Sequence, residues 1–413
     1  MTKEVKVLII GGGASGLIAA IAAARNGAKV TILEKMDRVG KKLLATGNGR
    51  CNLTNINMDL RFFHGKNVKF AQGILRAFDV EQTLTLFEYL GIAYKVEEGG
   101  KVFPMSDQAS SVLDVLRYQL EELKIEECCN AEVVRIIRDK EGFRIVLKDG
   151  KSVGGDKVII ATGGKAGPQF GSDGEGYKLL EELGHSVIEP IPALVQLKLK
   201  ASFLKALKGV KFIGEASIMM EEKALRTEAG EILFTDYGIS GPPILQLSRR
   251  ASTALTNEKT KIHIRLNMFP HLTEKELMEL LEIRLGYQPQ KPLDFSFIGL
   301  LNKRLIPVVL KEAGVKELQK KCGEVSQKEL KNIIKILRQW EIEVVGTQSW
   351  KNAQTTAGGV NVEDINGKTL ESKLIPGLYL AGEVIDIDGD CGGFNLQWAW
   401  SSGYIAGEYA GLS

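Results

Sequence analysis

Residues 6–16 read Lys6-Val7-Leu8-Ile9-Ile10-Gly11-Gly12-Gly13-Ala14-Ser15-Gly16. The apolar run at 6–10 predicts a buried parallel strand, and Gly11, Gly13 and Gly16 supply the GxGxxG pattern. The first glycine permits a tight turn, the second lets the backbone approach a pyrophosphate, and the third lets the next helix pack close to the strand. The free N–H groups at the start of that helix are expected to face the phosphates.

A second strand completes this unit. Lys29-Val30-Thr31-Ile32-Leu33 follows an alanine-rich helix at 17–26 and ends at Glu34, about 20 residues after the glycine turn. A carboxylate there is expected to hold a ribose 2′-OH, which argues against a 2′-phosphate. GxGxxG alone is weak evidence, but strand, turn, helix, strand and acid in one compact unit predict a Rossmann nucleotide-binding domain.

Two later segments indicate which dinucleotide binds. A strand at 156–160 ends in Ala161-Thr162-Gly163-Gly164, and a strand at 377–381 ends in Gly382-Glu383. Both resemble elements of the glutathione-reductase-like flavoproteins, where the first returns the chain to the nucleotide domain and the acid of the second binds near the ribityl chain and pyrophosphate. The glycine-rich loop 386–395 then leads into a helix whose positive end would stabilise the anion of a reduced flavin. We therefore predict non-covalently bound FAD.

Cofactor contacts at both ends of the chain predict a discontinuous domain. The expected fold class is α/β, with a Rossmann FAD-binding domain at 1–190 plus 350–413 and an insert between them. Alternating apolar positions predict that the insert begins as a β-rich barrel, at 191–268 plus 340–349. Helical periodicity predicts a helical subdomain at 269–339. The strands expected in the insert are 194–199, 210–219 and 262–266, and the helices expected in the chain include 80–90, 110–123, 273–285, 303–313 and 326–340.

The composition fits a globular protein, with 413 residues of which 44% are hydrophobic and 25% charged. The uncharged run 7–24 contains a glycine turn that would break a membrane helix, and we expect no membrane association. Five cysteines without a CxxC pair favour reduced thiols in the cytoplasm, and neither they nor the four histidines predict a metal site. Residues 191–345 sum to a charge of about +7, which favours solvated lysine faces over a polyanionic partner.

Several further segments form a specific combination that spans nearly the whole chain in order. They are Gly40-Lys41-Lys42-Leu43-Leu44-Ala45-Thr46-Gly47-Asn48-Gly49-Arg50-Cys51-Asn52-Leu53-Thr54-Asn55, Val102-Phe103-Pro104, the run 161–174, Phe234-Thr235-Asp236-Tyr237-Gly238-Ile239-Ser240-Gly241-Pro242, and the run 382–403. In this combination the sequence resembles the bacterial HI0933-like flavoproteins, also called the BaiN/RdsA family of FAD-dependent oxidoreductases. The resemblance implies FAD, a Rossmann domain interrupted by barrel and helical domains, and reductase or oxidase chemistry.

Activities proposed within that family leave three functions open. The leading hypothesis is an NAD(P)H-using reductase of a conjugated C=C bond, in a steroid-like or other small molecule or in a uridine of ribosomal RNA, where it would form dihydrouridine. The alternatives are a flavin amine oxidase that passes electrons from aminoacetone-like substrates to O2, and a non-catalytic flavin-bound module that binds a partner. No second GxGxxG unit is apparent in the sequence. Either NAD(P)H would therefore dock only transiently over the flavin, or the enzyme would pass electrons to O2.

Motifs and resemblance together predict the residues that contact the cofactor: Gly11, Gly13, Ala14, Ser15, Gly16, Glu34, Lys35, Lys42, Leu43, Gly47, Asn48, Val133, Ala161, Thr162, Gly163, Gly382, Glu383, Asp386, Gly393, Phe394 and Asn395. Residues 39–55 are expected to pass over the isoalloxazine, with Lys41, Lys42 and Arg50 meeting a phosphate or a substrate anion.

Cys391 is the candidate catalytic residue. The family resemblance implies Thr or another residue at this position in many relatives. A thiol at a helix N-terminus has a lowered pKa and could donate the proton that accompanies hydride transfer to a C=C bond. The alternative is a small residue packed in a crowded loop. The same two hypotheses, a reactive thiol or a packed small residue, apply to Cys51.

Overall fold

The computed structural model describes residues 4–140, 142–258 and 260–412. The chain separates into two compact units: unit 1 runs to Pro192 and resumes at Gln354, and unit 2 is Ala193–Ala353. From the sequence we expect the domain boundaries between residues 190 and 191 and between residues 349 and 350. The sequence also separates a barrel from a helical subdomain, whereas the structure gives both one continuous hydrophobic core within unit 2.

Unit 1 is built on a five-stranded parallel sheet in the order β20-β11-β1-β2-β7. Its strands are β1 (Lys6–Ile10), β2 (Lys29–Leu33), β7 (Glu126–Cys128), β11 (Lys157–Ile160) and β20 (Leu378–Leu380). β1 pairs in parallel with β2 on one side and with β11 on the other. The order of the strands along the chain therefore reverses at β1, since β2 lies on one side of it and β11 on the other. Such a switch point opens a crevice at the carboxyl ends of the strands. This confirms the predicted Rossmann-type α/β fold.

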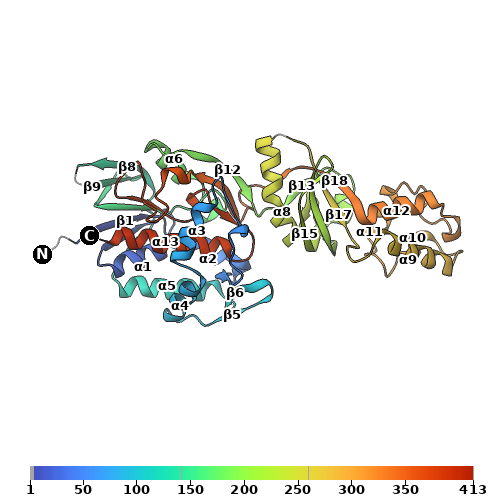
Figure 1. Cartoon of the computed structure of the whole chain (residues 1–413), viewed down its shortest axis with the longest axis horizontal. Coiled ribbons are helices and arrows are strands. Elements are labelled where there is room, and N and C mark those ends of the chain that lie inside the picture. Colours follow the sequence, from blue (N-terminus) through green and yellow to red (C-terminus); the bar gives the residue numbers. More distant parts are fainter. Residues whose placement is uncertain (1–3, 141, 259, 413) are drawn as a thin grey trace. The chain divides into compact units, whose positions relative to one another are not determined.

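Helices α1 (Ala14–Arg25) and α13 (Phe394–Gly411) lie side by side although they come from opposite ends of the chain (Figure 1). Gly403, Gly407 and Gly411 recur every fourth residue along α13 and so share one face. A methyl group at Gly407 would lie 2.2 Å from the carbonyl oxygen of Ala19, and one at Gly403 would lie 2.4 Å from that of Ser15. We call this contact between α1 and α13 the seam. At Gly403 and Gly407 the seam has room only for glycine.

Smaller elements surround the parallel sheet of unit 1. They are α2 (Lys41–Ala45), α3 (Lys69–Ala77), α4 (Val80–Tyr89), α5 (Ala109–Glu122) and α6 (Glu175–Glu182), the antiparallel strands β8 (Val133–Asp139), β9 (Gly142–Leu147) and β10 (Ser152–Gly155), and the short strands β3 (Thr54–Asn55), β4 (Phe63–His64), β5 (Tyr94–Val96), β6 (Lys101–Pro104) and β21 (Asp388–Gly389). The helices expected at 80–90 and 110–123 agree with α4 and α5 within one residue at each end.

The junction between the units is a strand rather than a linker. Pro190 and Pro192 both lie in β12 (Val187–Ala193), which pairs with β19 (Thr355–Val360) in a two-stranded sheet. Proline fits there because a strand with one neighbour leaves N–H positions that need no partner. Leu194 then adopts a φ of +51°, so the strand expected to start at this residue starts three residues later, as β13 (Leu197–Leu199).

Unit 2 contains a closed barrel in the order β13-β16-β15-β14-β17-β18. Its remaining strands are β14 (Lys211–Met220), β15 (Lys223–Phe234), β16 (Gly238–Ser240), β17 (Ile262–Asn267) and β18 (Trp340–Thr347). The alternating burial of β17, with every second residue inside, matches the period-two pattern of its sequence. A barrel closed by hydrogen bonds leaves no free strand edge in this sheet.

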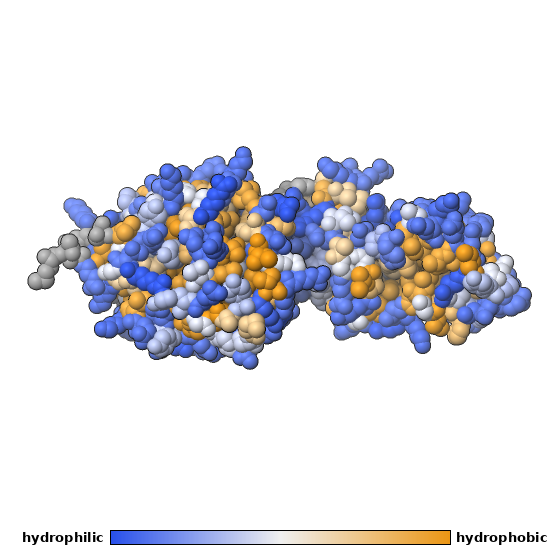
Figure 2. Space-filling model, turned by 60° about the horizontal axis from the view of Figure 1, so that its bottom comes forward, coloured by the Kyte–Doolittle hydropathy of each residue, from blue (hydrophilic) through white to orange (hydrophobic). Residues whose placement is uncertain are grey.

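Helices α8 (Pro242–Thr253), α9 (Glu274–Tyr287), α10 (Leu293–Ser296), α11 (Leu305–Glu312) and α12 (Gln327–Gln339) complete unit 2. Capping boxes at Thr273 and Ser326 fix the starts of α9 and α12, as their Thr-x-x-Glu and Ser-x-x-Glu spacings indicate. Figure 2 shows apolar surface over this part of the unit, where Ile283 and Phe295 are exposed. Across the residues that the structure describes, no helix is both long and apolar enough to cross a bilayer.

Candidate cofactor and active site

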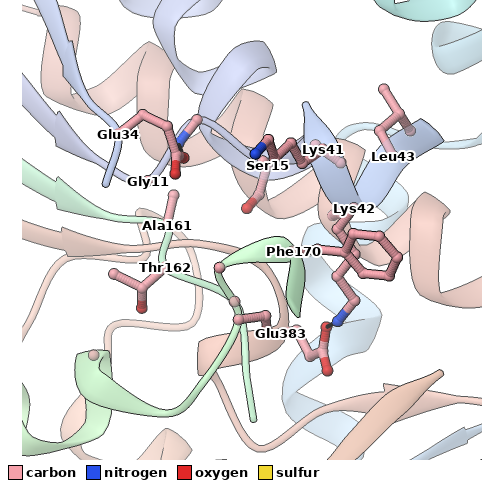
Figure 3. Close-up of a pocket in the computed structure, with 18 of the residues that line it drawn as sticks. Gly11, Ser15, Glu34, Lys41, Lys42, Leu43, Ala161, Thr162, Phe170 and Glu383 are labelled. Carbon is pink, nitrogen blue, oxygen red and sulfur yellow. Dashed lines mark hydrogen bonds and ion pairs between the residues drawn. The ribbon is translucent and has the colours of Figure 1, made fainter. Parts of the chain in front are cut away.

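A pocket lies within unit 1 at the carboxyl ends of β1, β2 and β11, where the topology predicts a ligand (Figure 3). It encloses about 1270 Å³ of empty space, part of it open to solvent. Of the residues expected to contact the cofactor, fourteen line it: Gly11, Gly13, Ala14, Ser15, Glu34, Lys35, Lys42, Leu43, Val133, Ala161, Thr162, Gly163, Glu383 and Asn395. The tertiary fold therefore gathers segments from both ends of the chain at one crevice.

The N-terminus of α1 offers an anion site. Gly13 is its N-cap, no side chain caps the helix, and its first turn contains no acidic residue. A methyl group at Gly13 would point into open space, whereas one at Gly11 would lie 2.4 Å from the carbonyl oxygen of Ala161. Gly16 does not line the pocket, because its Cα packs against the oxygen of Gly11. These contacts match the three roles predicted for the glycines, and the free N–H groups suit a pyrophosphate.

The carboxylate of Glu34 is fixed by the backbone. Its Oε2 accepts a hydrogen bond from the N–H of Gly12 at 2.7 Å, and its Oε1 accepts one from the N–H of Met36 at 2.8 Å. The side chain is buried and lines the pocket next to the end of β2. Each carboxylate oxygen can accept a second hydrogen bond, so Glu34 fits the proposed contact with a ribose hydroxyl.

Three lysines that line the pocket are paired with carboxylates. Lys35 Nζ lies 2.5 Å from Asp173 Oδ2, and Lys42 Nζ lies 2.7 Å from Glu383 Oε2. Lys41 also lines the pocket and pairs with Asp37 at 2.5 Å. Figure 3 shows Lys42 reaching Glu383 beside the ring of Phe170.

Arg50 lies outside the pocket lining, which corrects the expectation that it meets an anion there. Its guanidinium forms ion pairs with Glu97 and Asp107 and lies 4.0 Å from the centre of the Phe103 ring. These two carboxylates hold the pKa of Arg50 above its usual value. The structural reason for the correction is that the β5–β6 turn and the segment after β6 supply carboxylates that the local sequence around Arg50 does not contain.

The N-terminus of α13 approaches the pocket from the other side. Gly393 is its N-cap, again without a side-chain cap and without an acid in the first turn. Asn395 lines the pocket and clamps the preceding loop, because it accepts from the N–H of Gly389 at 2.8 Å and donates to the oxygen of Gly389 at 2.7 Å. Asn395 thereby fixes where this helix begins.

Four of the predicted contacts near the C-terminus support the pocket without lining it. Gly382 packs against Ser15, and Gly393 packs against the backbone of Thr54. Phe394 stacks on Phe62 with ring centres 4.6 Å apart. Asp386 is buried, and its carboxylate accepts from the N–H of Lys66 at 2.7 Å.

The segment 39–55 contributes less than expected. Gly40, Lys41, Lys42, Leu43 and Thr46 line the pocket, but Gly47 and Asn48 do not and are exposed. The reason is local: residues 41–45 form α2, and residues 47 and 48 then take left-handed conformations that turn the chain away.

The location and the thiol pKa of Cys391 differ from what the sequence predicted. Cys391 does not line the pocket, and burial raises the pKa of its thiol, with Asp390 acting in the same direction and Lys101 against it. The expected lowering of this pKa is therefore wrong, because burial desolvates the thiolate. Cys51 is fully buried, and burial raises the pKa of its thiol to about 12.

Several pocket residues had no assigned role in the sequence. Phe170, Gly171, Ser172, Asp173 and Glu175 form one wall, and the only signal for them was the glycine-rich run 161–174. Gln354 and Thr355 line the pocket, and Leu396, Trp398 and Ala399 come from the first turns of α13. No motif pointed to Gln354 or Thr355; the hydroxyl of Thr355 donates to Asn395 Oδ1 at 3.2 Å, a contact with a residue forty positions away.

Comparison with known proteins gives a consistent result. Residues 5–409 match the family described as HI0933-like protein Rossmann domain. The chain is 38% identical over 407 residues to a 3-dehydro-bile acid delta(4,6)-reductase of Clostridium scindens, covering 98% of both chains. It is 30% identical over 409 residues to a ribosomal RNA dihydrouridine synthase of Haemophilus influenzae, covering 98% of both chains, and 29% identical to the protein of the same name from Escherichia coli, covering 97% of this chain and 96% of that one.

Proposed function

The chain belongs to the HI0933-like family, and from that membership we propose that it is an NAD(P)H-dependent reductase that saturates a conjugated C=C bond in a steroid-like small molecule. As a member of this family the protein is an FAD-dependent oxidoreductase. The observation that carries the finer proposal is the 38% identity, across the full length of both chains, to a reductase of a 3-dehydro-bile acid.

The pocket fits FAD on the evidence of its own atoms. An uncapped helix N-terminus beside a glycine whose missing Cβ leaves open space suits a pyrophosphate. A buried carboxylate at the end of β2 suits a ribose. When bound, FAD supplies hydride-transfer chemistry that no amino-acid side chain provides. The chain's own task is to bind the cofactor, orient it and exclude water.

Each wall of the pocket has a role in this proposal. The N–H groups of the first turn of α1 would hold the pyrophosphate, and Glu34 would hold the adenosine ribose. The first turn of α13, with Asn395 at its start, would face the edge of the flavin with the positive end of a helix dipole. Glu383, paired with Lys42, would lie near the ribityl chain.

Saturation of a C=C bond also needs a proton. Cys391 stays the candidate donor in this proposal, although it does not line the cofactor pocket and would have to meet the substrate beside it. Because burial raises its pKa, the thiol keeps its proton at neutral pH, so it can act as an acid but not as a thiolate nucleophile. Cys391→Ser retains an O–H donor and Cys391→Ala removes it. If Cys391 donates the proton, the alanine variant should reduce the substrate more slowly. The rate at which NAD(P)H reduces the flavin should not change in that variant. Equal rates in all three proteins would make Cys391 a packing residue.

A second candidate, reduction of a uridine in ribosomal RNA, is supported by the two dihydrouridine synthases among the relatives. Both candidates share one reaction, because dihydrouridine is uridine with one C=C bond saturated. The net charge of about +7 over residues 191–345 would suit an anionic substrate such as RNA, although solvated lysine faces are the simpler explanation. The higher identity to the bile-acid reductase ranks the small molecule first.

Anaerobic stopped-flow on the purified yellow protein tests the proposal. NADPH or NADH should bleach the flavin absorbance, and a 3-oxo steroid with conjugated double bonds should restore it. Restoration by no steroid would overturn the small-molecule version. In that case, loss of dihydrouridine from ribosomal RNA of a deletion strain, measured by mass spectrometry, would establish the RNA version. Bleaching by aminoacetone but not by either nicotinamide would instead identify an amine oxidase.

A further inference from the structure

One wall of the cofactor pocket is a glycine-rich loop, residues 164–174, which we call the strap. Its ends meet at a neck, where the N–H of Gly174 and the hydroxyl of Ser172 donate to the oxygen of Gly164 at 3.1 Å and 3.0 Å. Phe170, Gly171, Ser172 and Asp173 of the strap line the pocket. A compact loop with paired ends can swing as a unit about its neck.

The other walls have no such freedom. β1, β2 and the first turns of α13 belong to the hydrophobic core of unit 1, in which Leu8, Ile32 and Trp400 are completely buried. The strap makes no strand pairing, and its Lys165 and Gln169 are exposed. Its N-terminal leg is held by hydrogen bonds from the N–H groups of Lys165 and Ala166 to the hydroxyl oxygen of Thr356, at 2.8 Å and 3.0 Å. The pocket is partly open to solvent, but a cofactor lying against these walls leaves more readily when one of them moves, and segments with few buried apolar contacts open first.

The C-terminal leg of the strap is fastened to the end of β2. Lys35 Nζ lies 2.5 Å from Asp173 Oδ2 and 3.3 Å from Glu175 Oε2 in the first turn of α6. A methyl group at Gly171 would lie 2.9 Å from the side chain of Met36, so this side chain packs directly on the backbone of the strap beside the ion pair. Residues more than 130 positions apart in sequence are thus joined across the mouth of the pocket by one ammonium group and two carboxylates.

We propose that Lys35, with Asp173 and Glu175, forms a latch that holds the strap closed over bound FAD and must open for the cofactor to exchange. The side chains are partly exposed, at 21% for Lys35, 34% for Asp173 and 43% for Glu175. An ion pair of this kind is weak and is screened by salt. Such a latch sets a rate of release without trapping the cofactor.

The test measures FAD release from the purified holoprotein, by mixing it with an excess of a scavenging apoflavoprotein and following flavin fluorescence. Lys35→Gln should release FAD about two- to fivefold faster than wild type, the range that a half-exposed ion pair allows. Asp173→Asn combined with Glu175→Gln should give the same acceleration. Raising the salt from about 0.05 M to 1 M should speed release from wild type but not from Lys35→Gln.

A charge swap separates a latch from direct cofactor binding by Lys35. Lys35→Glu combined with Asp173→Lys should restore slow release, because the pair is remade with reversed sign. If Lys35 instead binds the cofactor itself, the swap will not rescue, and neutralising Asp173 and Glu175 will slow release by freeing the ammonium. Either result overturns the latch. The matched control is Lys208→Gln, which breaks the 2.7 Å ion pair with Asp236 in unit 2 and should leave the rate unchanged.

Hydrogen–deuterium exchange on the apoprotein gives a readout that needs no cofactor. Peptides covering 164–175 should exchange faster in Lys35→Gln than in wild type, and peptides from the strands of the parallel sheet should not change. Unchanged exchange at 164–175 would overturn the latch. If the protein bound no FAD at all, the assignment of the cofactor would be wrong. The exchange measurement on the apoprotein would still test the latch, because it needs no cofactor.

Discussion

The N-termini of α1 and α13 are alike in sequence and different in what their glycines do. Each helix follows a glycine N-cap, lacks a side-chain cap and carries no acid in its first turn. At Gly13 a methyl group would meet nothing within 4 Å, so the position leaves space for a ligand. At Gly393 a methyl group would lie 2.4 Å from the oxygen of Thr54, and the residue has a φ of +101°. At Gly393, therefore, the space that a side chain would need is filled by the backbone of Thr54.

The comparison teaches that one residue type can serve ligand binding at one helix and chain packing at the other. Substitution at α1 should therefore change affinity for FAD and spare the fold, whereas substitution at α13 should damage the fold first. The seam between the two helices links them, since Gly403 and Gly407 of α13 pack against the backbone of α1.

The largest effect is expected at that seam. Gly407→Leu would place its Cβ 2.2 Å from the oxygen of Ala19 and force the helices apart. Overpacking on this scale should cost about 3 kcal/mol or more of unfolding free energy and also weaken FAD binding, because both helix N-termini move. Urea denaturation and FAD titration measure the two effects. Glu408→Leu, on the half-buried next position, is the control that should leave both unchanged.

A smaller loss is expected at the start of α13. Gly393→Ala combines an unfavourable φ with a clash against Thr54, and we expect it to lower the unfolding free energy by about 2–3 kcal/mol. Gly49→Ala is matched to it, because Gly49 has a φ of +85° but nothing within 4 Å of an added methyl group. That control should cost only about 1 kcal/mol. Equal losses in the two variants would show that backbone strain, and not the contact with Thr54, determines the effect at Gly393.

The effect at α1 should appear in binding alone. Gly13 has a φ of −80°, which alanine adopts without strain, and the added methyl group would enter the pocket. Gly13→Ala should leave the melting temperature of the apoprotein unchanged and weaken FAD binding at least tenfold, about 1.4 kcal/mol. Fluorescence titration of the apoprotein with FAD measures the loss. Wild-type affinity in this variant would remove Gly13 from the cofactor site and end the contrast with Gly393.

The smallest effect concerns Cys51, which lies on the segment that Gly393 packs against. Burial raises the pKa of its thiol from 9.0 to about 12, so its contribution to stability is complete below pH 9 and falls as the pH rises toward 12. At about pH 8.5 the native thiol stays protonated and should resist iodoacetamide, whereas the urea-unfolded protein should be alkylated. Peptide mass spectrometry measures the modification. Rapid alkylation of Cys51 in the native protein would show that the segment opens.

Prediction from sequence succeeded where the deciding contacts are local. Lys6 to Glu34 form one strand–turn–helix–strand unit, and the fold and family that this unit and the later motifs predicted are confirmed. Prediction failed where a distant group decides the outcome. Arg50 is turned toward Glu97 and Asp107, which lie some fifty residues away in sequence. The pKa of Cys391 is raised by burial that its neighbours in sequence do not reveal.

The sequence by itself determined the class of fold, the family and the glycines on which a dinucleotide turn depends, because these follow from periodicity and from spacing within short segments. Only the tertiary structure decided which residues meet at the pocket. Lys35 faces Asp173, Lys42 faces Glu383, and Gly393 faces Thr54, in each case across more than a hundred residues. Such pairings depend on the order of strands in the sheet and on the close seam between α1 and α13, which no local pattern encodes.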